Sequence, residues 1–395
     1  MNKRAAEFLS SYQGMIALLA LLVVLWFAPS ALSAAGLSTL VLALFYAIGG
    51  VSFNFLYGSL GIFSLAQPVF IAVGGYTSIF LFNRFGVSPW LSLLIAPVIA
   101  AILALPVALV ATRIGGGAVL TALVTLIIAE AVTPILIAIT PLGGAIGLYA
   151  KSPPVITFGD MQFASGLTYV RILAVINVLF IAFWMWWKRS RFGLFTAAIK
   201  DSPEAAEAAG IANGRLRLSV FLIAAMLAAP AGVIFAQYNL LTSPDIFLGG
   251  TALFQIITIA LVGGAARPWG SLVGALLIVY VAQEVSNLSG SNPAAEPVTF
   301  AGVFVIMVLI VPRGLSGTWA RVVAQRRPDQ GGALSAIGGG TARSGSARAD
   351  SGTVSAADGT VSAAAGTVSA GSETTSVASD QQTDAQVVPG QTRPT

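Results

Sequence analysis

The sequence predicts an all-α fold, a polytopic bundle of about ten transmembrane helices followed by a disordered C-terminal tail. Hydrophobic residues make up 56% of the 395 residues and charged residues only 9%. No water-soluble fold of this size could cover so much apolar surface with polar groups. Apolar runs long enough to cross a bilayer also recur along the chain.

The composition excludes several kinds of chemistry. Cysteine and histidine are both absent, which removes disulfides, thiolate metal sites, cysteine nucleophiles and the commonest general base. We therefore expect no enzyme activity and no metal or cofactor bound by this chain. The net charge of +5 is spread over the edges of apolar runs rather than gathered in one patch, so nucleic acid is not an expected partner.

The N-terminal segment 1–13 carries Lys3 and Arg4 ahead of an apolar run at 14–32. A signal peptide also begins this way, and residues 31–34 form a weak cleavage-like site. The run is long enough to span a bilayer and leads almost directly into the next apolar stretch. We interpret it as a retained first span.

Nine further spans complete the predicted membrane domain, 14–317. Those before the central loop approach or reach the length that about 30 Å of hydrocarbon requires, whereas 248–263 and 297–311 are short. They cover residues 37–57, 62–82, 90–111, 118–140, 172–187, 218–238, 248–263, 269–287 and 297–311.

Orientation follows from the distribution of Lys and Arg, because cytoplasmic loops carry an excess of both. With the N-terminus inside, the cytoplasmic segments up to residue 327 hold Lys3, Arg4, Arg113, Lys188, Arg189, Arg191, Lys200, Arg215, Arg217, Arg267, Arg313, Arg321, Arg326 and Arg327. The outside keeps only Arg84, Lys151 and Arg171. The bias predicts a multi-pass protein of the bacterial inner membrane, in contact with lipid, with both termini in the cytoplasm.

The aromatic residues before Lys188 have two interpretations. Phe183, Trp184, Trp186 and Trp187 fit an aromatic belt at the cytoplasmic interface. They fit equally well against neighbouring helices.

The longest polar interruption is the predicted cytoplasmic loop at 188–217. Ser202 suits a helix N-cap, Pro203 the first helical position, Glu204 and Glu207 the first turns, and Gly210 a C-terminal stop. These signals predict a helix of about two turns. Its alanines, Ala205, Ala206, Ala208 and Ala209, allow close approach of another surface, either on a partner or on the same protein.

The second and third spans contain unusual polar and glycine residues. Asn54, Ser64 and Gln67 interrupt a hairpin that also holds Gly49, Gly50, Gly58, Gly61, Pro68, Gly74 and Gly75. Polar or irregular backbone in a membrane is tolerated inside protein or beside a water-filled path. The polar residues favour a path, whereas close helix packing explains the glycines as well.

Glu130 is the only acid well inside a predicted span. Such residues usually face the interior of a membrane protein. A neutral, hydrogen-bonded carboxyl is the alternative.

From about residue 328 the composition shifts to Gly, Ala, Ser, Thr and Asp, with GTVSA repeated at 352, 359 and 366. One valine per repeat is too little to bury a coiled-coil seam. We interpret 318–395 as a disordered, cytoplasmic low-complexity tail.

Several stretches, taken in order, resemble one family. They are NFLYGSLGIFSLAQ at 54–67, GGYT at 74–77, TLIIAE at 125–130, SRFG at 190–193, EAAEAAGI at 204–211, SPD at 243–245, VGG at 262–264, WG at 269–270 and VPRG at 311–314. The chain resembles the membrane permease of branched-chain amino acid ABC importers through most of 37–317. Two departures are Gln67 with Pro68, where relatives often have a histidine, and the ArgProTrpGly at 267–270, where a glycine-rich approach is more usual.

The resemblance implies roles for particular residues and partners. The segment 204–211 would engage ATP-binding-cassette ATPase subunits through Glu204, Ala205, Ala206, Ala209 and Gly210. Candidates for the substrate path are Asn54, Ser64, Gln67, Tyr76 and Glu130. A second permease subunit, either a copy or a sister chain, would complete the pore, an extracytoplasmic solute-binding protein would deliver the solute, and ATP would be used by the partner subunit.

We therefore expect alternating-access import of branched-chain or related amino acids. Urea, short amides or another small polar solute are alternatives within the same class. An ion-coupled secondary transporter would need more embedded acids or histidines and internal repeats, and a membrane transferase would need clustered acids to hold a metal and a diphosphate.

Overall fold

A computed structural model of the chain describes residues 20–113, 117–151, 157–158, 161–162, 166–264, 267–288, 298 and 301–302. The chain divides into two compact units, 1–328 and 329–395, and every described residue lies in the first. The predicted N-terminal segment, most of the last span and the low-complexity tail fall outside the described residues.

The described elements are almost all helices, which confirms the predicted fold class. They are η1 (Ala28–Ala31), α2 (Ala34–Leu60), α3 (Gln67–Phe85), α4 (Pro89–Arg113), α5 (Gly117–Ala138), η2 (Thr140–Leu142), β1 (Leu148–Tyr149), β2 (Thr157–Phe158), β3 (Met161–Gln162), α6 (Gly166–Arg189), α7 (Arg191–Asp201), α8 (Pro203–Ala208), α9 (Asn213–Asn239), β4 (Leu241–Thr242), α10 (Pro244–Leu248), α11 (Gly250–Gly264) and α12 (Gly270–Leu288).

Within the described ranges, seven helical segments are long and apolar enough to cross a membrane. They are α2, α4, α5, α6, α9, α10 with α11, and α12. The predicted span at 62–82 corresponds to α3, which begins at Gln67 because residues 61–66 leave the helix after α2. Gly61 ends α2 with a positive φ of 70°, a conformation that suits glycine.

The core is built around α2 and α9. Most of α2 is buried, and it packs against α6, α9, α11 and α12, while α9 packs against α3 and α4. A side chain at Gly74 would overlap the main chain of Ala229, and one at Gly232 would overlap that of Ile71. The α3 glycine therefore serves close helix packing, the second of the two interpretations of the hairpin glycines.

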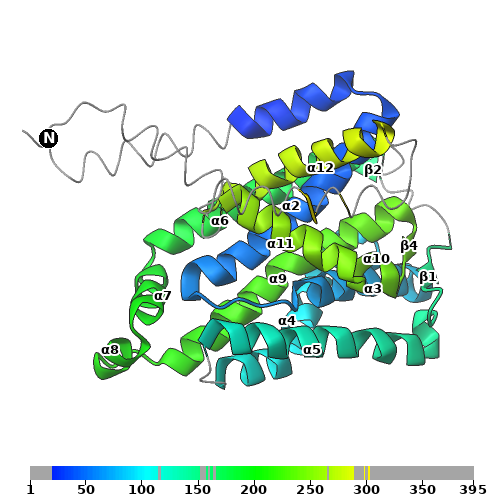
Figure 1. Cartoon of the computed structure of the whole chain (residues 1–395). Coiled ribbons are helices and arrows are strands. Elements are labelled where there is room, and N and C mark those ends of the chain that lie inside the picture. The colour runs from blue at the N-terminus through cyan, green and yellow to red at the C-terminus, as the bar shows by residue number, and fades with distance from the viewer. Residues whose placement is uncertain are drawn as a thin grey trace, which may run out of the picture. The chain divides into compact units, whose positions relative to one another are not determined.

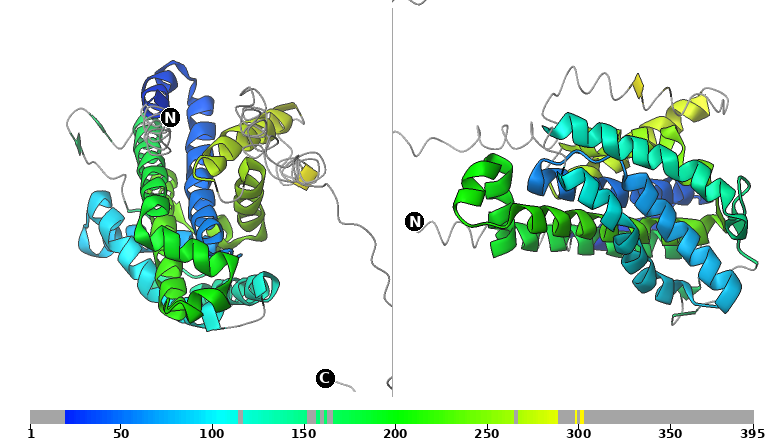
Figure 2. Two further views of the ribbon diagram at one scale, coloured as in Figure 1. Left: turned by 90° about the vertical axis from the view of Figure 1, so that its left-hand side faces the viewer. Right: turned by 90° about the horizontal axis from the view of Figure 1, so that it is seen from below.

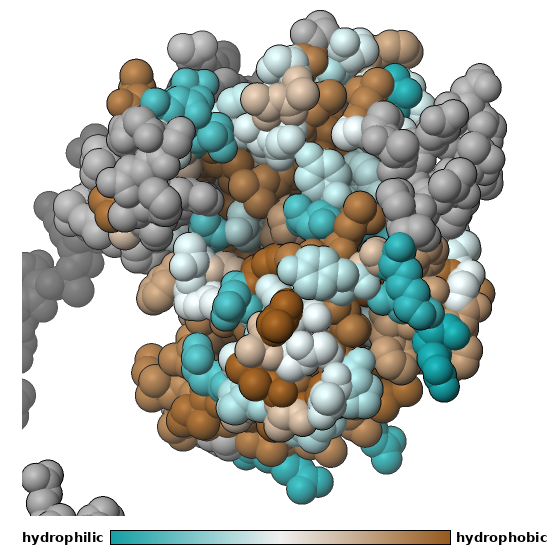
Figure 3. Space-filling view, turned by 90° about the vertical axis from the view of Figure 1, so that its right-hand side faces the viewer, coloured by the Kyte–Doolittle hydropathy of each residue, from teal (hydrophilic) through white to brown (hydrophobic). Residues whose placement is uncertain are grey.

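The helices run between two ends of the membrane unit (Figure 1). One end carries α7 and α8, which face the viewer in the left panel of Figure 2. At the opposite end β1 pairs with β4, joining Leu148 to Thr242. There the Asn83 side chain donates to Tyr149 O at 2.7 Å and accepts from Lys151 N at 3.0 Å. Hydrophilic and hydrophobic side chains are interspersed on this end (Figure 3).

The turn between α11 and α12 is tight and is built on glycines 263, 264 and 270. Gly264 has a φ of 112°, and Gly270 N donates to Arg267 O at 3.2 Å. A side chain at Gly263 would overlap the main chain of Gly270. Only glycine allows this approach without a shift in the backbone.

Candidate functional site

The predicted two-turn helix in the 188–217 loop is present as α8. The Ser202 hydroxyl accepts from Ala205 N at 3.3 Å, and Pro203 occupies the first position. At the other end Gly210 has a φ of 82°. Ile211 N donates to Ala206 O at 3.0 Å and Gly210 N to Glu207 O at 2.9 Å. These two bonds form a Schellman motif, so the local sequence signals are confirmed at both ends of the helix.

The alanines of α8 divide between two faces. Ala206 is 4% exposed and packs into the core of the chain. Ala205, Ala208 and Ala209 are exposed, together with Glu204 and Gly210. Ala206 is therefore unavailable to a partner, because one residue per helical turn must face the protein that carries α8. The exposed surface formed by Ala205, Ala208 and Ala209 is here called the alanine face.

Two hydrogen bonds fix this part of the loop to the membrane helices. Asn213 Nδ2 at the start of α9 donates to Pro203 O at 2.6 Å. Lys200 Nζ at the end of α7 donates to Gly58 O in α2 at 3.1 Å and lies 5.6 Å from the centre of the Tyr57 ring. These two hydrogen bonds attach the segment around α8 to the ends of two core helices, α2 and α9.

The SRFG stretch builds the elbow between α6 and α7. Ser190 caps α7 by accepting from Gly193 N at 3.2 Å, and its hydroxyl donates to Trp187 O at 2.7 Å. A side chain at Gly193 would overlap the main chain of Trp187. The glycine is needed because two helices meet here within van der Waals contact.

The polar residues predicted to line a path lie at helix interfaces within this chain. Asn54 is fully buried, and its amide nitrogen donates to Ser271 Oγ at 2.8 Å and to Ala260 O at 3.2 Å. It joins α2 to α11 and α12. Buried amides often hold membrane helices together, because hydrocarbon offers no other partner for them.

Gln67 and Ser64 lie at the break between α2 and α3, and both are about 1% exposed. Ser52 Oγ lies 2.9 Å from Gln67 Oε1 and 2.6 Å from Ala224 O, so this cluster joins α2, α3 and α9. The Ser64 hydroxyl accepts from Ala66 N at 3.3 Å. The next residue, Leu65, donates its main-chain N–H to Thr125 Oγ1 of α5 at 3.0 Å.

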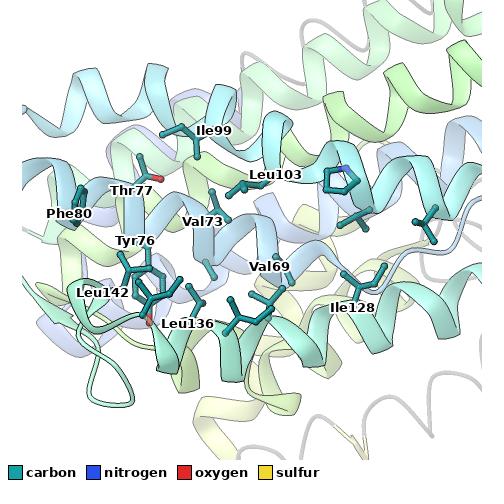
Figure 4. A pocket seen from close by; sticks show the side chains of 17 residues that line it. Val69, Val73, Tyr76, Thr77, Phe80, Ile99, Leu103, Ile128, Leu136 and Leu142 are labelled. Carbon is teal, nitrogen blue, oxygen red and sulfur yellow. The ribbon is translucent and has the colours of Figure 1, made fainter.

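Tyr76 lines a cavity of about 600 Å³ between α3, α4 and α5 (Figure 4). Tyr76 and Thr77 are the polar side chains of its wall; the others are Val69, Ala72, Val73, Phe80, Ile99, Leu103, Pro106, Val107, Val110, Ile128, Val132, Ile135, Leu136, Ile139 and Leu142. Tyr76 is 5% exposed, and its hydroxyl lacks a hydrogen-bond partner among the described residues. In Figure 4 the hydroxyl lies near Leu136 and Leu142.

Glu130 lies near the middle of α5 on the outer surface of the chain. α5 runs along one edge of the bundle (Figure 1). Only 17% of its most apolar stretch is buried. The exposed side chains around Glu130 are apolar, with Ile127 67% and Ile137 42% exposed. The carboxyl therefore points away from the interior of this chain.

Among the described residues no group of three or more acids is placed to hold a metal ion. Sequence reasoning missed the parts played by Lys200, Ser52 and Thr125. Lys200 was counted only as one of the positive charges that indicate membrane orientation. A lysine at the end of a short helix can also reach carbonyl groups of a neighbouring helix. Ser52 and Thr125 carried no usable signal, because small hydroxyl residues occur throughout membrane helices.

Fold and site together define a polytopic helical membrane protein with a capped helical elbow at one end. The family model described as "Branched-chain amino acid transport system / permease component" matches residues 36–312. The chain belongs to this family of permease components of transport systems.

Curated relatives include permeases for different solutes. The branched-chain amino acid permease LivH of Salmonella typhimurium is 28% identical over 158 residues, 40% of this chain and 50% of the relative. The galactose/methyl galactoside permease MglC of Haemophilus influenzae is 28% identical over 162 residues, 39% and 47% of the two chains. The ribose permease RbsC of Escherichia coli K12 is 25% identical over 225 residues, 51% and 67%. The chain thus spans about half the length of LivH, and no solved structure matches.

Proposed function

We propose that this chain forms part of the translocation path of an ABC importer for branched-chain or related aliphatic amino acids. The apolar cavity between α3, α4 and α5 is the observation that carries the choice of solute. Its wall offers the hydroxyls of Tyr76 and Thr77 and otherwise hydrocarbon. A sugar placed there would leave several hydroxyls without partners, at roughly 1–3 kcal/mol each. The aliphatic side chain of an amino acid would lose no hydrogen bond there, with its ammonium and carboxylate groups kept outside the apolar wall.

The alanine face of α8 is the proposed contact with the ATPase. The family consists of the permease components of transport systems, and an external energy source requires a mechanical link. The exposed alanines allow a close fit, and the Lys200 and Asn213 hydrogen bonds attach α8 to α2 and α9. Closure of the ATPase subunits would move α8, and with it these helix ends, as a rigid body.

The outer face of α5 is the proposed lining of the path, with a second permease chain on its far side. A charged residue facing lipid at the middle of a bilayer costs about 3 kcal/mol, so Glu130 is better placed against protein or water. The exposed residues Ile127 and Leu123 lie one and two turns before it, respectively, on the same face. Asn54, Ser64 and Gln67 then support the path from behind by fixing α2, α3 and α9.

The decisive experiment compares solutes in vesicles that contain the whole importer. ATP-dependent uptake of leucine should exceed uptake of ribose or galactose. Leu136→Asn, which puts an amide into the cavity wall, should lower leucine uptake. Leu94→Asn is the matched control, because Leu94 is 71% exposed on α4 and away from the cavity. Preferred uptake of ribose or galactose would refute the choice of solute, and equal uptake by the two variants would remove the cavity from the path.

Import of sugars is the second candidate, because MglC and RbsC are also among the relatives. The fully buried amides of Asn54 and Asn177 offer hydrogen-bonding groups of the kind a sugar site needs. Both amide nitrogens are already bonded to neighbouring helices, Asn177 to Leu44 O at 3.0 Å. The same uptake experiment decides between the candidates.

A further inference from the structure

The elbow between α6 and α7 presents aromatic side chains on its outer surface. Trp186 is 60% exposed, Phe192 54% and Phe195 40%. Phe192 is not a loose side chain, because its ring stacks on Trp187 at 5.7 Å and 21°. Trp187 itself is 6% exposed and packs against Phe55 of α2 at 5.5 Å. The exposed rings therefore stand on a rigid base.

This surface continues the membrane-facing side of α6. Leu179, 59% exposed, lies two helical turns before Trp186 on the same face. The ring of Phe183 lies 5.9 Å from that of Trp186. At the elbow the apolar face passes from the span to α7, which crosses the end of the bundle (Figure 1). Exposed aromatic rings at the end of a span are typical of the headgroup region of a bilayer.

Basic residues lie beside these rings. Arg189 and Arg191 flank the elbow residue Ser190, and both are exposed. Lys188 is exposed too, with its ammonium 4.7 Å from the centre of the Trp184 ring. A guanidinium group fits a phosphate well because it can donate two parallel hydrogen bonds.

We infer that the α6–α7 elbow binds the headgroup of an anionic phospholipid. Arg189 and Arg191 bind its phosphate, and Trp186 and Phe192 lie against the upper part of its acyl chains. The occupant is lipid rather than the ATPase, because the aromatic surface is continuous with the lipid-facing side of α6. The alanine face, by contrast, lies beyond α7 on a different helix. The position of α7, and through Lys200 that of the end of α2, then depends on the membrane surface.

The test uses the purified full-length protein in lipid nanodiscs that contain phosphatidylcholine with or without phosphatidylglycerol. Co-purifying lipid is measured by mass spectrometry after exchange into detergent. The protein should retain phosphatidylglycerol over phosphatidylcholine. The double variant Arg189→Gln with Arg191→Gln should reduce this preference by about fivefold for each arginine removed.

Arg113→Gln with Arg215→Gln is the matched control, because both arginines are exposed at the ends of other helices. It should keep the preference. Bromine on the acyl chains of phosphatidylglycerol should also quench part of the tryptophan fluorescence, and Trp186→Phe should remove that part.

Equal phosphatidylglycerol retention by both double variants would overturn the inference. So would loss of ATPase binding by the elbow variant with unchanged lipid retention, which would assign the surface to the ATPase. Neither result affects the choice of transported solute, which rests on the cavity.

Discussion

The ammonium group of Lys200 donates a hydrogen bond to the main-chain oxygen of Gly58 at 3.1 Å and so ties α7 to the last turn of α2. Three residues after Gly58 the helix ends at Gly61, and the chain leaves it towards Ser64 and Gln67. Leu65 in that segment bonds to Thr125 of α5. A series of contacts therefore runs from Lys200 at the end of α7, through the break between α2 and α3, to α5, the helix that carries Glu130.

This series predicts that Lys200→Met impairs coupling rather than assembly. Methionine keeps most of the aliphatic stem but loses the hydrogen bond to Gly58 and the contact with Tyr57. At an exposed site the loss amounts to about 1 kcal/mol, roughly a fivefold effect. Uptake per molecule of ATP hydrolysed should fall in proteoliposomes, while co-purification with the ATPase persists. Lys200→Arg should restore much of the coupling, and full coupling in the methionine variant would exclude the link.

The two faces of α8 should respond differently to a large side chain. Ala205→Trp and Ala208→Trp should weaken co-purification with the ATPase, because the added rings separate surfaces that would otherwise pack closely. Ala206→Trp should lower the melting temperature of the purified permease itself, because Ala206 is buried in its own chain. Full ATPase binding by Ala205→Trp and by Ala208→Trp would show that the alanine face does not contact the ATPase.

Topology can be checked without removing any background thiol, because the chain has no cysteine. Ile146→Cys, at a position 72% exposed at the β1 end, should react with a membrane-impermeant maleimide added to intact cells. Ala208→Cys should react only after the membrane is opened. The reverse pattern would invert the predicted orientation.

Asn54 and Ser271 should be energetically coupled. Asn54→Ala and Ser271→Ala each remove the same 2.8 Å hydrogen bond at a buried interface between α2 and α12. Each change should lower the free energy of unfolding by about 1–2 kcal/mol, and the double variant by less than the sum. Thermal unfolding of the four proteins in detergent measures this. Additive losses would mean that the bond contributes little.

Glu130→Gln keeps the size of the side chain and removes its charge. Normal uptake of leucine by this variant would mean that the ionised carboxylate is not required for transport. If the outer face of α5 meets the same face of a second copy of this chain, Ile127→Cys carried by both copies should form a disulfide cross-link under oxidising conditions. A cross-link confined to this position, and absent from Leu94→Cys on α4, would place α5 at the subunit boundary. Exclusive labelling of Ile127→Cys by a lipid-phase reagent would place that face in the bilayer instead.

Much of this protein could be predicted from local sequence signals. The lengths of the apolar runs predicted the membrane helices from α2 to α12, because hydrocarbon thickness sets helix length directly. The Ser202, Pro203 and Gly210 signals predicted α8, because capping is satisfied by neighbours within a few residues.

Only the tertiary structure decided which way each side chain faces. Asn54 and Gln67 could line a path or join helices, and the close packing of α2 against α9, α11 and α12 puts their polar groups between helices. Ala206 could not be distinguished from Ala205 until the course of α7 set the rotation of α8. The hydrogen bond between Lys200 and Gly58 spans 142 positions along the sequence, so no local pattern could contain it. Membrane spans and helix caps depend on residues close together in the sequence. The direction in which a side chain faces, and the contacts between distant segments, depend on which helices pack together.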